Sequence, residues 1–205
     1  MAQHKLGYIT ASIAKRFLTG SKSKPENLLV GNLTACKEIA LERLELDGHA
    51  LPDPDDAFVG DKHTERGNRL ESANIEEAQR RLGKQIHSHQ HMFEHNIERW
   101  SCTVDGLVGD NAIYEAKAPT RKNQVDYILN KGSLYKEYKD QIQFQLMLSG
   151  REYVYIGAFC PLFLNDNRLF IETVEVDKEW RDFAQVRLAK CEEEIQHIYD
   201  ELLNA

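Results

Sequence analysis

Long hydrophobic runs are absent from this chain, and cysteine is scarce. No stretch approaches the roughly 18 apolar residues that span a bilayer, and the beginning of the chain, MAQHKLGYITAS, has no signal-like apolar segment. We therefore expect no membrane association and a cytoplasmic location. The four cysteines are never paired as CxxC, which predicts reduced, buried thiols and not a disulfide framework or zinc knuckle. They are Cys36, Cys102, Cys160 and Cys191.

Basic residues are outnumbered: 26 Lys and Arg stand against 33 Asp and Glu, for a net charge of −7. This balance argues against a nucleic-acid partner, because phosphate binding depends on Lys and Arg. However, residues 1–25 carry five basic residues and no acid, and acids gather between Glu172 and Glu201. Salt screens charges beyond about 8–10 Å, so a separated basic surface can attract DNA locally. Ordinary solvated faces would produce the same pattern.

Hydrophobic periodicity predicts helices, then strands, then a closing helix. Residues 50–65 are rich in Pro, Asp and Gly and predict a loop, whereas residues 87–119 alternate as strands do. A second strand pair is predicted at 151–163 and 167–176. This order indicates a single α/β domain over residues 1–205. Helices are predicted from a cap at Thr10 or Ser12 to Leu18, and over 27–46, 64–82, 121–149 with a break near 131–133, and 178–203.

Three charged residues form the most informative pattern. The segments around Asp105 and Glu115 predict two short strands joined by a tight Gly-Asp-Asn turn, with Asp105 on the first strand. Alternate residues of a strand share a face, so Glu115 and Lys117 project together, with Cα atoms about 6–7 Å apart. Two converging carboxylates are an oxygen site of the kind that Mg²⁺ prefers. A lysine beside that ion can orient or help to deprotonate a water molecule.

The flanking residues decide between a functional site and an exposed, charged hairpin. Three charged residues alone would fit the exposed hairpin. Glu115 and Lys117 lie between Ile113-Tyr114 and Ala118-Pro119, which indicates a largely buried hairpin. Unbalanced charge there costs several kcal/mol unless a metal or a partner compensates it. The pattern therefore favours metal-assisted phosphodiester hydrolysis.

Five short motifs, in order, resemble a known family. GNRLE contains Glu71, TVDG contains Asp105, and YEAK contains Glu115 and Lys117. DQIQFQLML follows, and LGYITAS stands near the beginning of the chain. Together with REYVYIGAFCP, these motifs resemble the PD-(D/E)XK nucleases over roughly residues 5–175. The narrower resemblance is to the phage lambda exonuclease, or alkaline exonuclease, branch of YqaJ-type viral recombinases. It implies a restriction-endonuclease-like central mixed β-sheet flanked by α-helices.

The resemblance also implies roles for the matched residues. Asp105 and Glu115 would bind Mg²⁺, which Mn²⁺ could replace, with the Ala116 carbonyl as a further ligand. Lys117 would activate or orient the attacking water. Glu71 would support a second metal or its water shell, and Gln141 would reach into the site. Glu71 could instead be a solvated helix residue, and Gln141 with Gln145 a polar stripe on a helix, but we favour the functional interpretation for Glu71 and Gln141.

A second group of residues would bind DNA and its 5′ phosphate. In this branch an N-terminal arginine holds that phosphate, and Lys5 stands nearest its place. Lysine offers a point charge without the bidentate fork of arginine. Ser12 and Thr103 are candidate hydroxyl partners for the phosphate, and Gln143 lies in the same motif as Gln141.

The resemblance implies 5′→3′ digestion of one strand at double-stranded DNA ends, leaving a 3′ single-stranded tail for recombination. It also implies a homotrimer ring that threads DNA and a single-strand annealing protein as partner, in the cytoplasm of a bacterial host. Two alternatives remain open. One is a PD-(D/E)XK endonuclease or a repair nuclease of other polarity, and the other is a catalytically silent DNA-binding scaffold.

A histidine-rich stretch offers a different metal site. His87, His89, His91 and His95 alternate, and with Cys102 they could bind zinc. Their spacing lacks the paired pattern of compact zinc sites. An exposed strand that carries histidines is the interpretation we favour.

Overall fold

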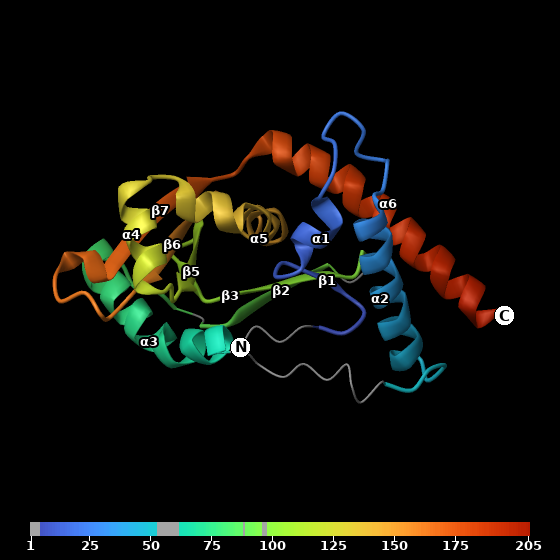
Figure 1. The fold of residues 1–205 in the computed structure, drawn as a ribbon, viewed down its shortest axis with the longest axis horizontal. Helices are drawn as coiled ribbons and strands as arrows, with labels where there is room; N and C mark the ends of the chain where they lie inside the picture. Colours follow the sequence, from blue (N-terminus) through green and yellow to red (C-terminus); the bar gives the residue numbers. More distant parts are fainter. Residues whose placement is uncertain (1–4, 53–61, 88, 96–97) are drawn as a thin grey trace.

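The computed structural model describes residues 5–52, 62–87, 89–95 and 98–205 (Figure 1). These residues form a mixed α/β fold, as the sequence predicts. The helices are α1 (Ala14–Leu18), α2 (Val30–Leu46), α3 (Lys62–Leu82), α4 (Arg121–Leu129), α5 (Ser133–Ser149) and α6 (Lys178–Leu203). The strands are β1 (Ile9–Thr10), β2 (His91–His95), β3 (Trp100–Val104), β4 (Gly106–Val108), β5 (Ala112–Lys117), β6 (Tyr153–Phe159) and β7 (Leu169–Glu175).

Local sequence signals set the ends of several helices. The predicted break near 131–133 in the helical segment 121–149 is confirmed. Helix α4 ends at Leu129, and Gly132, with φ 86°, immediately precedes α5. A left-handed backbone of this kind suits glycine, which has no Cβ. The side chain of Asp177 accepts a hydrogen bond from the Trp180 amide and so caps α6.

The strands form two sheets where the sequence had suggested one central sheet. The first has the order β1-β3-β2, with β3 parallel to β1 and antiparallel to β2. The second has the order β4-β5-β6-β7, in which only β5 and β6 are parallel. The predicted hairpin is shorter than expected, because it joins only β4 to β5. The chain passes from the first sheet to the second at Asp105, so this residue lies between strands and not within one.

Two helices enclose the second sheet. Side chains of one face, such as Ile113 and Ile156, pack toward α5, whereas Tyr114 and Tyr155 pack toward α3. The same alternation carries Glu115 and Lys117 to the α5 face. The strand period therefore delivers both charged residues to one helix.

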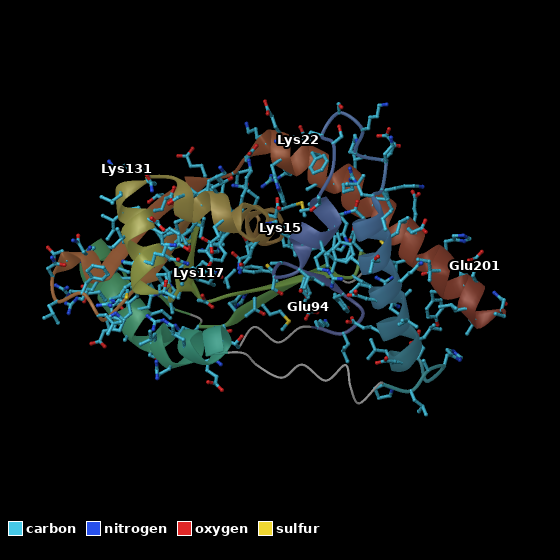
Figure 2. All side chains as sticks on the ribbon, viewed as in Figure 1. Lys15, Lys22, Glu94, Lys117, Lys131 and Glu201 are labelled. Carbon is cyan, nitrogen blue, oxygen red and sulfur yellow. The ribbon has the colours of Figure 1, made fainter. Side chains whose placement is uncertain are left out.

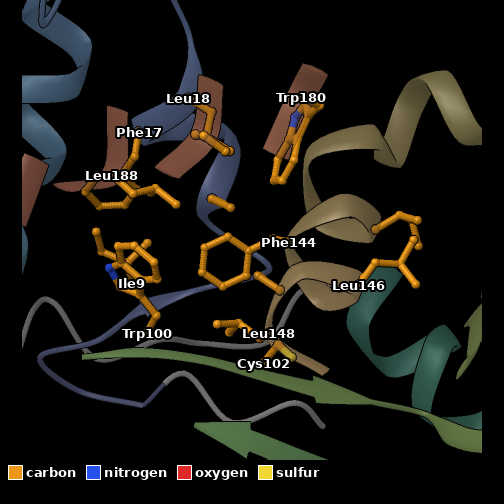
Figure 3. Packing of buried hydrophobic residues seen from close by; sticks show 14 of the residues in the cluster. Ile9, Phe17, Leu18, Trp100, Cys102, Phe144, Leu146, Leu148, Trp180 and Leu188 are labelled. Carbon is orange, nitrogen blue, oxygen red and sulfur yellow. The ribbon is translucent and has the colours of Figure 1, made fainter. Parts of the chain in front are cut away.

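The larger core lies between the first sheet, α1, α5 and α6 (Figure 3). Phe144 of α5 occupies its centre, between Trp100 of β3 and Trp180 of α6, and Phe17 of α1 completes the cluster. Each of these side chains is at most 8% exposed. Burial of such a side chain contributes about 1.5–3 kcal/mol, so this core fixes α5 firmly against both sheets.

The cysteine prediction is confirmed: Cys36, Cys102, Cys160 and Cys191 are all free and buried. Among the residues that the structure describes, no helix is long and apolar enough to cross a membrane.

Candidate active site

Glu115, Lys117 and Gln141 form a closed hydrogen-bonded group. Lys117 Nζ lies 2.8 Å from Glu115 Oε1 and 3.1 Å from Gln141 Oε1. The Gln141 amide nitrogen donates to the same Glu115 oxygen at 2.6 Å. Tyr138, one turn before Gln141 on α5, lies beneath the ammonium, with Nζ 4.3 Å from the ring centroid. The structure thus brings together three of the residues selected from the sequence.

Gln145 belongs to the same group, although sequence reasoning gave it no role in the site. Its amide nitrogen donates to Glu115 Oε2 at 2.8 Å and to the Thr103 carbonyl at 3.2 Å. Glu115 is only 4% exposed, and both of its oxygens accept hydrogen bonds. The four-residue spacing from Gln141 to Gln145 was the available signal, because it places both amides on one helical face.

Asp105 faces this group from the junction of the two sheets. Its Oδ2 accepts a hydrogen bond from the Ala116 amide at 2.7 Å. Its Oδ1 accepts one from Gln90 Nε2 at 3.1 Å, and the same nitrogen donates to Glu71 Oε1 at 2.8 Å. Gln90 therefore links the two acids. No local pattern pointed to Gln90, because its role depends on contacts between distant segments.

The electrostatics show an excess of buried negative charge. Burial raises the pKa of Asp105 to about 8, and the neighbouring Glu115 and Glu71 carboxylates act in the same direction. The Lys117 ammonium and the Ala116 amide oppose this rise. Burial of Lys117 acts to lower its pKa, but Glu115 and Asp105 outweigh burial, so its pKa is raised. The ammonium is therefore charged at neutral pH, whereas Asp105 is held largely protonated until a cation approaches.

Helix α3 is fixed to the site by Asn74. Its amide nitrogen donates to the carbonyls of Lys117 at 3.2 Å and Gly157 at 2.8 Å, and its Oδ1 accepts from the Tyr114 hydroxyl at 2.6 Å. Asn74 lies one turn after Glu71 on α3. These bonds therefore hold the helix that carries Glu71 at a set distance from β5.

The donor atoms fit an oxygen-ligated divalent cation, although they are not arranged as a ready-made cage. Among the described residues, no three His, Cys, Asp or Glu side chains surround one metal position. Glu71 and Asp105 instead converge on the Gln90 amide, and Glu115 faces Lys117. The raised pKa of Asp105 indicates that the group lacks positive charge. Carboxylate oxygens are the ligands that Mg²⁺ and Mn²⁺ prefer, so the residues present suit such an ion.

The residues selected for the 5′ phosphate lie along the first sheet. Thr10 of β1 is paired with Ser101 of β3; Ser12 lies in the turn that follows β1, and Thr103 lies two residues further along β3. The Ser12 hydroxyl is 3.1 Å from that of Thr10. Lys5 forms an ion pair with Glu94 at 2.6 Å, and a phosphate would have to replace this contact.

Gln143 requires a correction. It points away from the site and is 2% exposed. Its amide nitrogen donates to the Tyr135 hydroxyl at 3.0 Å and to the Glu175 carbonyl at 2.9 Å, and its oxygen accepts from the Asp177 amide at 2.8 Å. Because these partners occupy the amide, Gln143 joins α5 to the start of α6 and is not positioned to bind DNA.

The histidine-rich segment is also shorter as a strand than expected. The strand β2 begins at His91, because Gln90 has a positive φ of 56°. His87 instead makes an isolated bridge with Leu107. His91 contacts the ring of Phe93, and His95 lies 3.9 Å from Glu98. The described histidines and cysteines form no metal-binding cluster. No side chain of β2 is fully buried.

In Figure 2, Lys15 and Lys117 lie near the middle of the view, whereas Glu201 lies at the far end of α6. The acidic end of the chain is therefore remote from Lys117.

The chain belongs to the YqaJ-like viral recombinase domain family, which residues 2–152 match. Its fold is that of solved exonucleases. It is similar to an alkaline exonuclease (LHK-Exo) from Laribacter hongkongensis, with 22% identity, a TM-score of 0.74, and coverage of 97% of this chain and 95% of that one. A second structure of that enzyme is a complex with dAMP. A phage-related exonuclease from Haemophilus somnus 129PT has 17% identity, a TM-score of 0.76, and coverage of 95% and 96%.

The comparison with curated proteins finds no match. The resemblance identified from the sequence motifs is confirmed by the family match, and the PD-(D/E)XK-like fold by the structural likeness.

Proposed function

We propose that this protein is a divalent-metal-dependent exonuclease that digests one strand of linear double-stranded DNA in the 5′→3′ direction. The observation that carries the proposal is the meeting of Asp105, from the junction between β3 and β4, with Glu115 and Lys117 of β5, although Glu115 is almost fully buried. Membership of the YqaJ-like family and the likeness to exonuclease structures support it.

A bound Mg²⁺ or Mn²⁺ would supply Lewis-acid polarisation of the phosphate and a more acidic water molecule. Asp105, Glu115 and Glu71, with the Ala116 carbonyl, would hold the ion. Water adds to phosphorus, the bond from phosphorus to the leaving oxygen breaks, and a proton from that water ends on the leaving alcohol.

Lys117 contributes as a charged donor. Its pKa is raised by Glu115 and Asp105, so the ammonium keeps its proton at neutral pH. It can orient the attacking water and stabilise negative charge that develops on the phosphate. Gln141 fixes this ammonium, because it accepts from Lys117 and donates to Glu115.

The direction of digestion depends on recognition of the 5′ end. Ser12 and Thr103 would donate their hydroxyls to the terminal phosphate, with Lys5 contributing charge after release from Glu94. The 3′ single-stranded tail would be passed to a single-strand annealing protein. A homotrimer ring would keep the DNA enclosed between successive cleavages and would gather the basic segments of three copies around it.

The test uses linear duplexes labelled at the 5′ or the 3′ end, with a 5′ phosphate or a 5′ hydroxyl, in Mg²⁺ or in EDTA. We expect metal-dependent loss of the 5′ label as mononucleotides, with the 3′-labelled strand shortening progressively, and faster digestion of the 5′-phosphorylated substrate. Asp105→Asn should abolish this activity, whereas Asp110→Asn, an exposed aspartate in the β4–β5 turn, should not. Equal digestion by Asp105→Asn would refute the site. Cleavage of a covalently closed plasmid would replace the proposal with an endonuclease.

A further inference from the structure

Gln90 is placed at the edge of the site by an unusual backbone conformation. It immediately precedes β2, and His91 of β2 is paired with Val104 of β3. Gln90 therefore lies opposite Asp105, where these two segments of the chain leave the first sheet. Its φ is 56°, in the left-handed region that residues with side chains seldom adopt. Conformations of this kind persist where the surrounding structure holds them, and they concentrate at functional sites.

The Gln90 carboxamide presents the wrong end to the acids for metal binding. Its nitrogen carries two hydrogens, and it donates to Glu71 Oε1 at 2.8 Å and to Asp105 Oδ1 at 3.1 Å. Its oxygen, Oε1, is buried and makes no hydrogen bond with the described residues. A buried acceptor without a partner is rare and calls for a physical explanation.

The spacing of these atoms supplies that explanation. Mg²⁺ takes octahedral ligands at about 2.0–2.1 Å, so neighbouring ligand oxygens lie about 2.9 Å apart. The amide nitrogen is separated from the two carboxylate oxygens by 2.8 and 3.1 Å. It therefore lies at the separation from each acid that a third ligand oxygen would have, but it is a nitrogen that carries hydrogens.

We propose that Gln90 is an oxygen ligand of the divalent cation, an inference that rests on the metal-dependent nuclease proposed above. Rotation of the carboxamide about its last bond exchanges Nε2 and Oε1. An oxygen then completes a triad with Glu71 and Asp105, and the unpartnered acceptor gains a partner. In the nitrogen-inward arrangement the amide hydrogens partly compensate the charge of the two acids.

The experiment measures binding of Mn²⁺ and of Mg²⁺ to the full chain by calorimetry, without DNA. Gln90→Met keeps an unbranched chain but removes the oxygen, and we expect it to weaken the affinity by about 10- to 100-fold. Gln90→Glu keeps an oxygen and adds charge, so it should bind at least as tightly as the parent, because ligand charge raises affinity. Gln85→Met, an exposed glutamine five residues earlier, is the matched control.

The glutamate variant separates a ligand from a hydrogen-bond donor. A carboxylate can coordinate the ion but cannot donate to Glu71 and Asp105, so weak binding by Gln90→Glu would overturn the proposal. Unchanged or tighter binding by Gln90→Met would also overturn it, because the amide would then be dispensable or a competitor of the ion. Thermal unfolding in EDTA checks that each variant is folded. If Gln90→Met does not fold, the metal affinity of Gln90→Glu decides the test.

Failure of this proposal differs from failure of the nuclease proposal. If the parent binds no metal, the metal-dependent function itself is refuted. If the parent binds metal, Asp105→Asn loses it, and Gln90→Met retains it, only the role of Gln90 is refuted.

Discussion

Replacing Asp105 by asparagine should stabilise the metal-free protein at alkaline pH. The substitution preserves size and an oxygen that can accept from the Ala116 amide. It removes a carboxylate that lies among Glu115, Glu71 and low-dielectric surroundings. These neighbours and burial raise the pKa of Asp105 from 3.8 to about 8. The folded protein therefore destabilises the ionised form.

The sign of the pH dependence follows from this difference. Between about pH 4 and pH 8 the unfolded chain has released the Asp105 proton and the folded chain retains it. The unfolded state binds fewer protons, so stability falls as pH rises through this window. At about 1.4 kcal/mol for each pH unit, the full difference sets an upper limit of about 6 kcal/mol. Partial contact of the carboxyl with solvent lowers this cost, and we expect about 2–3 kcal/mol at pH 8.5.

The assay is urea unfolding of parent and Asp105→Asn in EDTA at pH values from 5 to 8.5, with Asp110→Asn as control. The advantage of Asp105→Asn should grow with pH and should shrink when saturating Mg²⁺ is added, because the ion stabilises the parent alone. A stability difference that is independent of pH would refute the electrostatic account. So would a parent that Mg²⁺ does not stabilise.

Three further perturbations test other parts of the site and its support. Lys117→Ala should lower kcat by roughly 100-fold or more with little change in KM, because the proposed role of Lys117 lies in the transition state. Normal turnover with lost DNA binding would instead show that Lys117 binds the phosphate. Gly157→Ala should cost about 1–3 kcal/mol in urea unfolding, since a new Cβ would meet the buried Tyr114 ring with Cζ at 2.6 Å. The comparison is Gly67→Ala within α3, which has open space around the new Cβ and should be at least as stable as the parent. Arg187→Met should lower the free energy of unfolding by about 3 kcal/mol, because the guanidinium is fully buried and donates to the Asn27 carbonyl at 2.8 Å. A variant as stable as the parent would show that the buried hydrogen bonds of Arg187 contribute nothing to stability.

The local rules of the chain were enough to determine much of the fold. Helix α6 has the predicted bounds, because an apolar stripe and an Asp177 cap act over neighbouring residues. The strand period alone placed Glu115 and Lys117 on one face, and the structure shows them in contact at 2.8 Å. The turn from Gly109 to Asn111 was also predictable from the sequence, because Gly109 supplies the positive φ that the turn needs.

The sequence did not decide which glutamines of the α5 motif face the site. Gln141 and Gln143 belong to one motif and differ by only two positions. On a helix this separation turns the side chains to different faces. Gln141 therefore reaches Lys117, whereas Gln143 binds the Glu175 carbonyl and the Asp177 amide. Only the packing of α5 against the sheets decided which face met the acids.

The sequence by itself determined which residue types carry the chemistry and the order in which they occur, because strand and helix periods are local properties. Tertiary structure alone decided that the sheet divides at Asp105 and that Gln90, in a left-handed conformation, meets Glu71 there. It also decided how far the pKa of Asp105 rises. These features depend on burial and on contacts between segments far apart in the chain, and no local pattern encodes such contacts.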